Sequence, residues 1–184
     1  MTMNAKPTDI LEEEHRLIEQ AVAGMAVLAD ALEAGQAVEG QMLQDIVEFM
    51  RTYADKRHHG KEEDILFPLL LARGVPAQGC PIGALTHEHQ EGRALVGAFA
   101  EAAAAYAQDR TATEAVVRGL RVLIELYPNH IWKEDYLLFP MTNKILGPED
   151  QDALQAQFQA VDRGMGDTVV RHFQQVVAGL PGSR

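Results

Sequence analysis

Residues 58–68 read His-His-Gly-Lys-Glu-Glu-Asp-Ile-Leu-Phe-Pro, and the main features of this segment occur a second time in the chain. His58, Glu62 and the Leu-Phe-Pro that follows return as His130, Glu134 and a second Leu-Phe-Pro, each 72 residues later. Residues at i and i+4 lie on one face of a helix, so each copy presents an imidazole beside a carboxylate. The repeat indicates two halves of one helical bundle that turn the same chemical pair toward a shared centre.

The composition predicts a globular domain with a small-molecule or metal partner. At 184 residues, 47% hydrophobic and 23% charged, the chain is long enough for one domain, residues 1–184, with a sizeable core. The formal net charge of −11 and the lack of a cluster of Lys and Arg argue against a nucleic-acid partner.

Cysteine content and the absence of apolar runs bear on the compartment. Cys80 is the only cysteine, which excludes an intrachain disulfide and a thiolate zinc site and fits a reducing compartment. Residues 1–4 carry no basic and apolar leader pattern, and no run of about 18 apolar residues occurs. We therefore expect a cytoplasmic protein with no membrane partner.

Apolar residues recur at spacings of three and four throughout, which predicts an all-α fold. Four long helices are expected at about residues 8–34, 39–72, 82–108 and 111–146, with bends at Pro68, Pro128 and Pro140 because proline lacks the backbone donor. Gly74–Gly83 forms a loop that joins the two halves. A fifth helix over about residues 149–178 is expected to pack on the outside of the bundle.

Two further histidines continue apolar helix stripes, one in each half. His15 lies on the core-facing stripe of the first helix. In the third helix, His89 lies on the main apolar stripe, whereas His87, about 200° away around the helix, lies on a weaker face. The 72-residue offset from His15 favours His87 instead. We give more weight to the periodicity, because burial is decided on the helix itself while connecting loops can differ in length.

Together these positions predict a site with nitrogen and oxygen ligands: His15, His58, Glu62, His89, His130 and Glu134. Imidazole and carboxylate without thiolate suit iron, manganese or zinc, and two bridging carboxylates suit a pair of metals. His59 with Glu63 is the alternative pair on the second helix, but Ile131 and Asp135 occupy the matching positions in the second copy, and isoleucine cannot bind metal. A lone histidine on an apolar stripe is usually a hydrogen-bonded core residue, but two carboxylates buried without a cation would be costly.

Other polar residues near the predicted site receive more ordinary interpretations. The acidic run Glu12–Glu14 is expected to be a solvated first turn that complements the helix dipole. Asp135, His87 and Glu19 stay open as additional ligands, and Glu19 is more typical of a surface residue. His172 has no acidic partner in register and is expected at the surface or in packing.

These motifs resemble the hemerythrin-like family of cation-binding domains. The likeness runs from Ile10 to about Ile145 and rests on Glu14-His15, residues 58–68, Glu88-His89 and residues 130–135. It implies an up-down four-helix bundle that holds two iron ions, bridged by two carboxylates and by oxo or hydroxo, with manganese or zinc as substitutes. The family's Glu-His dipeptide also favours His89 over His87.

One position departs from the oxygen-carrying members of that family, which are similar but use a fifth histidine one turn from the third-helix ligand. Here Leu85 and Arg93 stand four residues before and after His89. With two histidines for each metal, both metals are expected to keep an open position for oxygen, nitric oxide or peroxide. We expect a protein that binds or senses oxygen, nitric oxide or iron. The alternative is a di-iron oxidoreductase, peroxidase-like or repairing iron centres, and a regulatory module comes third.

Overall fold

The computed structural model describes residues 6–182 of the chain, and the prediction about a leader at residues 1–4 falls outside this part. Every regular element among residues 6–182 is a helix, so the predicted all-α class is confirmed. Within the same residues, no helix is long and apolar enough to cross a membrane.

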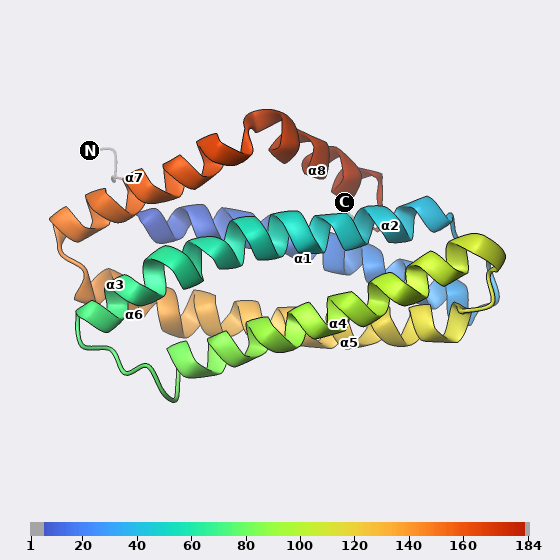
Figure 1. Cartoon of the computed structure of the whole chain (residues 1–184), viewed down its shortest axis with the longest axis horizontal. Helices are drawn as coiled ribbons and strands as arrows, with labels where there is room; N and C mark the ends of the chain where they lie inside the picture. The colour runs from blue at the N-terminus through green and yellow to red at the C-terminus, as the bar shows by residue number, and fades with distance from the viewer. Residues whose placement is uncertain (1–5, 183–184) are drawn as a thin grey trace.

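Four long helical stretches lie side by side along the molecule (Figure 1). The first is α1 (Pro7–Glu33) and the third is α4 (Ile82–Asp109). The second runs from α2 (Gly40–Phe49) through two π-helical segments, η1 (Met50–His59) and η2 (Glu62–Leu66), into α3 (Phe67–Ala72). The fourth runs from α5 (Thr113–Lys133), which continues through Pro128, into the π-helical η3 (Glu134–Leu138) and then α6 (Phe139–Ile145).

The sequence repeat is also a repeat of backbone geometry. Glu62 opens η2 and Glu134 opens η3, and in each case Leu-Phe-Pro carries the chain back into an α-helix with the proline in its first turn. Proline has no donor for the preceding turn and its ring clashes there, and a wider π-helical turn just before it relieves that conflict. Each half therefore brings its glutamate into the interior at an equivalent point of a helix.

The C-terminal region covers the bundle as two helices rather than the single helix predicted. α7 (Pro148–Met165) and α8 (Asp167–Gly179) meet at Gly166, whose φ of 86° favours glycine because an L side chain rarely adopts it. Both helices lie along the bundle (Figure 1) and pack against α1. The buried side chains on their inner faces are Leu154 and Phe158 of α7 and Phe173 of α8. His172 is exposed, in line with the prediction of a surface residue.

The core consists of two apolar clusters with a polar layer between them. One cluster includes Leu11 and Leu85, and the other includes Ile18 and Val96. His15 lies between Leu11 and Ile18 along α1, and His89 lies between Leu85 and Val96 along α4. Apolar packing therefore encloses the polar layer on both sides. Apolar packing of this kind keeps water away from the charged groups within it.

Candidate metal centre

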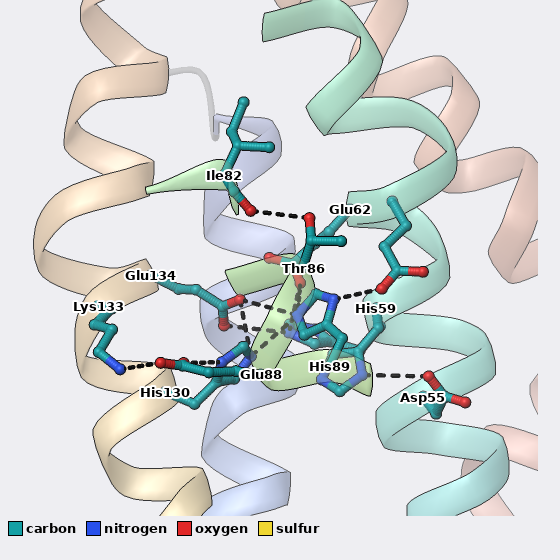
Figure 2. A network of polar contacts seen from close by, with 12 residues as sticks. Asp55, His59, Glu62, Ile82, Thr86, Glu88, His89, His130, Lys133 and Glu134 are labelled. Atoms are coloured by element: carbon teal, nitrogen blue, oxygen red, sulfur yellow. Dashed lines mark hydrogen bonds and ion pairs between the residues drawn. The ribbon is translucent and has the colours of Figure 1, made fainter. Parts of the chain in front are cut away.

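The polar layer contains all six residues predicted to bind metal. Each is at most 3% exposed, and the set, called here the central cluster, consists of His15, His58, Glu62, His89, His130 and Glu134. Figure 2 shows His89, His130, Glu62 and Glu134 converging from α4, α5, η2 and η3. His87 is exposed, so periodicity identified the inward histidine of α4 where the repeat offset did not.

The central cluster divides into two groups that share one carboxylate. His15, His58 and Glu134 offer ligand atoms within 4.8 Å of one another, and so do Glu62, His89, His130 and Glu134. Glu134 Oε2 lies 3.0 Å from His15 Nε2, and its Oε1 lies 3.0 Å from His130 Nε2. One oxygen therefore faces each group, which is the placement that a carboxylate bridging two neighbouring metals requires.

Each histidine of the central cluster is oriented by a carboxylate on its outer side. The Nδ1 atoms of His15 and His89 lie 2.6 Å and 2.7 Å from Asp135 and Glu63. Those of His58 and His130 both lie 3.0 Å from a carboxylate oxygen, belonging to Glu14 and Glu88 respectively. Because an ionised carboxylate only accepts hydrogen bonds, each Nδ1–H donates and each Nε2 is left to face inward.

The outer carboxylates follow a cross-helix pattern. Glu14 precedes His15 in sequence but orients His58, and Glu88 precedes His89 but orients His130. In the same way, Glu63 follows Glu62 but orients His89 on α4. The two halves of the repeat thus use equivalent partners, and each ligand motif also supports a ligand on another helix.

The inward nitrogens meet in pairs that require a cation. His15 Nε2 lies 2.9 Å from His58 Nε2, and His89 Nε2 lies 3.2 Å from His130 Nε2. With Nδ1 protonated on every ring, neutral imidazoles would point two lone pairs at each other at this distance. Each pair is stable only if a proton or a metal ion lies between the nitrogens.

Among residues 6–182, the carboxylates of Glu62 and Glu134 also lack hydrogen-bond donors. Within residues 6–182, no hydrogen bond reaches any oxygen of Glu62 or Glu134, although imidazole nitrogens approach to 3.0 Å. Burial, together with the negative charge of Glu134, raises the pKa of Glu62 well above its usual value. Burial also opposes the ionisation of Glu134, but the neighbouring charge of His130 lowers the pKa of Glu134 well below its usual value. Buried carboxylates without donors are unfavourable unless cations neutralise them.

The pKa values of two central histidines also indicate that the site favours positive charge. Burial alone would lower the pKa of His15, but its contacts with Asp135 and Glu134 outweigh burial and raise that pKa to about 9. Burial is likewise outweighed at His130, where Glu134 and Glu88 raise the pKa to about 9. Without metal these rings hold protons at neutral pH. The donor set therefore fits metal cations, which must displace those protons on binding.

Basic side chains balance the outer carboxylates. Arg93 Nη2 lies 2.9 Å from Glu63, and the Lys133 ammonium pairs with Glu88 (Figure 2). On the opposite side, Arg16 pairs with Asp135. The inner charges are thus surrounded by a ring of carboxylates and a further ring of cations.

The expectation that Glu12–Glu14 is a solvated turn is wrong at Glu14. Its side chain is buried, orients His58, pairs with the fully buried Lys61, and lies 3.0 Å from Arg57 Nη1. Burial opposes ionisation, but His58, Lys61 and Arg57 lower the pKa of Glu14 to about 2. Asp162 of α7 completes this network at 2.7 Å from Lys61 Nζ. The position of Glu14 on the helix directs its side chain inward. The prediction failed because it treated the three consecutive glutamates as one solvated turn.

None of the three residues kept open as additional ligands joins the central cluster. Asp135 orients His15, Glu19 pairs with Arg16 at the surface at 2.8 Å, and His87 is exposed. The residue that sequence reasoning set aside is His59, which is 3% exposed and stacks on His89 with ring centroids 3.9 Å apart. His59 ends the π-helical η1 and is buried next to His58, as Ile131 is buried next to His130 in α5.

The chain matches a known protein family over most of its length. Residues 6–142 match the model of the hemerythrin HHE cation binding domain, and the chain belongs to this family. No curated protein and no solved structure matches the chain. The resemblance found in the sequence motifs is confirmed, and the central cluster lies within the matched residues.

Proposed function

We propose that the central cluster holds two metal ions, iron in the cell, inside an up-down four-helix bundle, and that the protein binds a small ligand such as oxygen, nitric oxide or peroxide there. The observation that carries this proposal is the pairing of inward Nε2 atoms at 2.9 Å and 3.2 Å beside carboxylate oxygens that lack hydrogen bonds. Two cations would remove the repulsion between the facing Nε2 lone pairs and would neutralise the buried carboxylates.

The donor types support iron, with manganese or zinc as substitutes. Four imidazoles and two carboxylates form a borderline to hard ligand set without thiolate. Iron bound in this set supplies one-electron chemistry and open positions for small ligands. As part of the proposal, we place the protein in the reducing cytoplasm, with the single Cys80 as support.

The chain's own residues hold and insulate the site. The outer carboxylates keep each imidazole in the tautomer that presents Nε2 and make that nitrogen a stronger donor. Their pairing with Arg16, Lys61, Arg93 and Lys133 balances their negative charge. The apolar clusters on both sides exclude water, which strengthens every electrostatic interaction in the polar layer.

A cavity lies on one side of the central cluster, and His59, which stacks on His89, forms part of its wall. It has a volume of about 280 Å³ and is lined by Met50, Arg51, Asp55, His59, Gly92, Arg93, Val96 and Tyr127. The wall combines apolar groups with Arg51 and with the ion pair of Arg93 and Asp55, which suits a small polar molecule.

This cavity favours the second candidate function, an oxidoreductase. A volume of about 280 Å³ exceeds what a diatomic ligand needs, so an organic peroxide or a reductant fits beside the central cluster. The proposal of a binding protein and the proposal of an enzyme therefore differ in whether this cavity takes a second substrate.

Rapid mixing of the reduced, iron-loaded protein with oxygen or peroxide separates the two functions. A binding protein gives an optical spectrum that reverts when oxygen is removed. An oxidoreductase oxidises its iron once in single turnover and consumes peroxide catalytically when a reductant is supplied. Iron that stays reduced and spectrally unchanged with oxygen, nitric oxide and peroxide would contradict both.

A further inference from the structure

The two halves of the repeat differ in how the lysine beside the central cluster is enclosed. Lys133 stands 72 residues after Lys61, which is the offset of the repeat, and each lysine pairs with a glutamate that orients a histidine. The side chain of Lys133, paired with Glu88, is 31% exposed. The side chain of Lys61, paired with Glu14, is fully buried. The element that covers Lys61 therefore distinguishes the first half from the second.

That element is α7, which follows both halves in the sequence and packs against α1, η1 and η2 (Figure 1). Asp162 Oδ1 lies 2.7 Å from Lys61 Nζ. Phe158, one turn earlier on the same face of α7, places its ring centroid 5.8 Å from that ammonium. A buried ammonium is unfavourable unless carboxylates neutralise it, so α7 supplies part of the charge that stabilises Lys61 in this position.

Arg57 connects α7 to the same glutamate by a second route. Arg57 Nε donates to Asp162 Oδ1 at 2.9 Å, and Arg57 Nη1 lies 3.0 Å from Glu14 Oε1. The residue 72 positions after Arg57 is Asn129, which is exposed, uncharged and bonded to a backbone carbonyl of its own helix. A cation at this position is thus a feature of the first half alone.

Glu14 has to serve a histidine and two cations at once. Its Oε2 accepts a hydrogen bond from His58 Nδ1 at 3.0 Å, while its Oε1 faces Lys61 and Arg57. Asp162 shares both cations with Glu14. Without Asp162, two buried positive charges would act on Glu14 alone and draw it away from His58. Apolar packing of α7 does not require a carboxylate at this position.

We propose that Asp162 is a positioning residue: through the two cations that it shares, it holds Glu14 in place for His58. The inference rests on the proposed di-metal centre. The metal of the His15 and His58 group then depends on the C-terminal region. The other group receives its outer carboxylates from η2 and α4, so that displacement of α7 would loosen one metal and leave the second in place.

Titration of the full-length protein with Co²⁺ tests this dependence. Asp162→Asn keeps the size of the side chain but removes its charge, and Asp152→Asn at an exposed position of α7 is the matched control. We expect Asp162→Asn to bind one of two ions at least about 3-fold more weakly, a smaller loss than the roughly 10-fold expected where a carboxylate touches the ligand itself. The control should bind as the wild type does. Asp162→Glu keeps the charge and should bind the weakened ion more tightly than Asp162→Asn, and equal affinities in these two variants would contradict the inference.

Proton NMR of the Co²⁺-loaded proteins separates positioning from a general loss of stability. The Nδ1–H resonance of His58, identified as the one that Glu14→Gln moves, should also move in Asp162→Asn. The resonance of His130, identified in the same way with Glu88→Gln, should stay in place.

Three results would count against the inference. Unchanged affinities and an unchanged His58 resonance in Asp162→Asn would overturn the role of Asp162 and leave the di-metal centre intact. Equal weakening of both ions would indicate a general loss of stability and would overturn that role too. A wild-type protein that binds no Co²⁺ would overturn both the role of Asp162 and the di-metal centre.

Discussion

His15 and His58 face each other through their Nε2 atoms at 2.9 Å, although they come from α1 and η1 and are each tied on the opposite side to a carboxylate. This relationship constrains the chemistry of the polar layer. Neither ring can turn away without giving up its bond to Asp135 or Glu14, so the space between them must hold positive charge. A proton serves this purpose in the metal-free protein, and a metal ion replaces it.

Glu134 is expected to affect both metals, because one of its oxygens faces each group. Glu134→Gln should weaken binding of both ions by at least about 10-fold each, measured by titration with Co²⁺ or Fe²⁺ under anaerobic conditions. Glu13→Gln at an exposed position of α1 is the control and should bind as the wild type does. Loss of only one metal in Glu134→Gln would show that this carboxylate does not bridge.

His89 and His87 provide a matched pair on one helix. His89→Ala removes an inward nitrogen that lies 3.2 Å from His130 Nε2, so we expect loss of one metal ion. His87→Ala alters only an exposed side chain, and both metal content and melting temperature should stay within error. The opposite result would mean that α4 is rotated from the orientation described.

Glu14 should contribute to stability even without metal. Glu14→Gln leaves Lys61 buried with only Asp162 as an anionic partner, and removing one member of a buried ion pair costs about 3 kcal/mol. Urea denaturation of the metal-free protein measures this loss. The neighbouring Glu13→Gln should change the free energy of unfolding by less than about 0.5 kcal/mol. Equal effects of the two substitutions would contradict the buried role of Glu14.

The pH dependence of the metal-free protein follows from His15 and His130, whose pKa values are raised from 6.5 to about 9. The folded state then binds more protons than the unfolded state, so this stabilisation is complete below about pH 6.5 and is lost as pH rises toward about 9. Each ring accounts for at most roughly 3 kcal/mol. Thermal melts from pH 6 to 9.5 should show the decline in the presence of a chelator. In the metal-loaded protein the decline should vanish, because metal has displaced the protons. A metal-free protein that gains stability over this range would contradict the assignment.

The sequence predicted the helices and the central cluster because both depend on local periodicity and on a repeat. It did not predict which carboxylate orients which histidine, since the pairing of Glu14 with His58 or of Glu88 with His130 depends on how the helices lie against each other. His59 was set aside because the matching residue of the second half, Ile131, cannot bind metal. Both residues are buried, so the comparison identified the ligand types that the two halves share but not every side chain that lies inward.

The central claim is that residues of both halves jointly hold two metal ions, and metal content together with stability tests it most directly. Protein purified from iron-replete cells, or reconstituted anaerobically with Fe²⁺, should contain about two metal ions per chain. Its melting temperature should fall when a chelator removes them, since a ligand at 100 times its dissociation constant stabilises the folded state by about 2.7 kcal/mol. A protein that takes up no metal from Fe²⁺, Mn²⁺ or Zn²⁺ and melts at the same temperature with and without chelator would contradict the account.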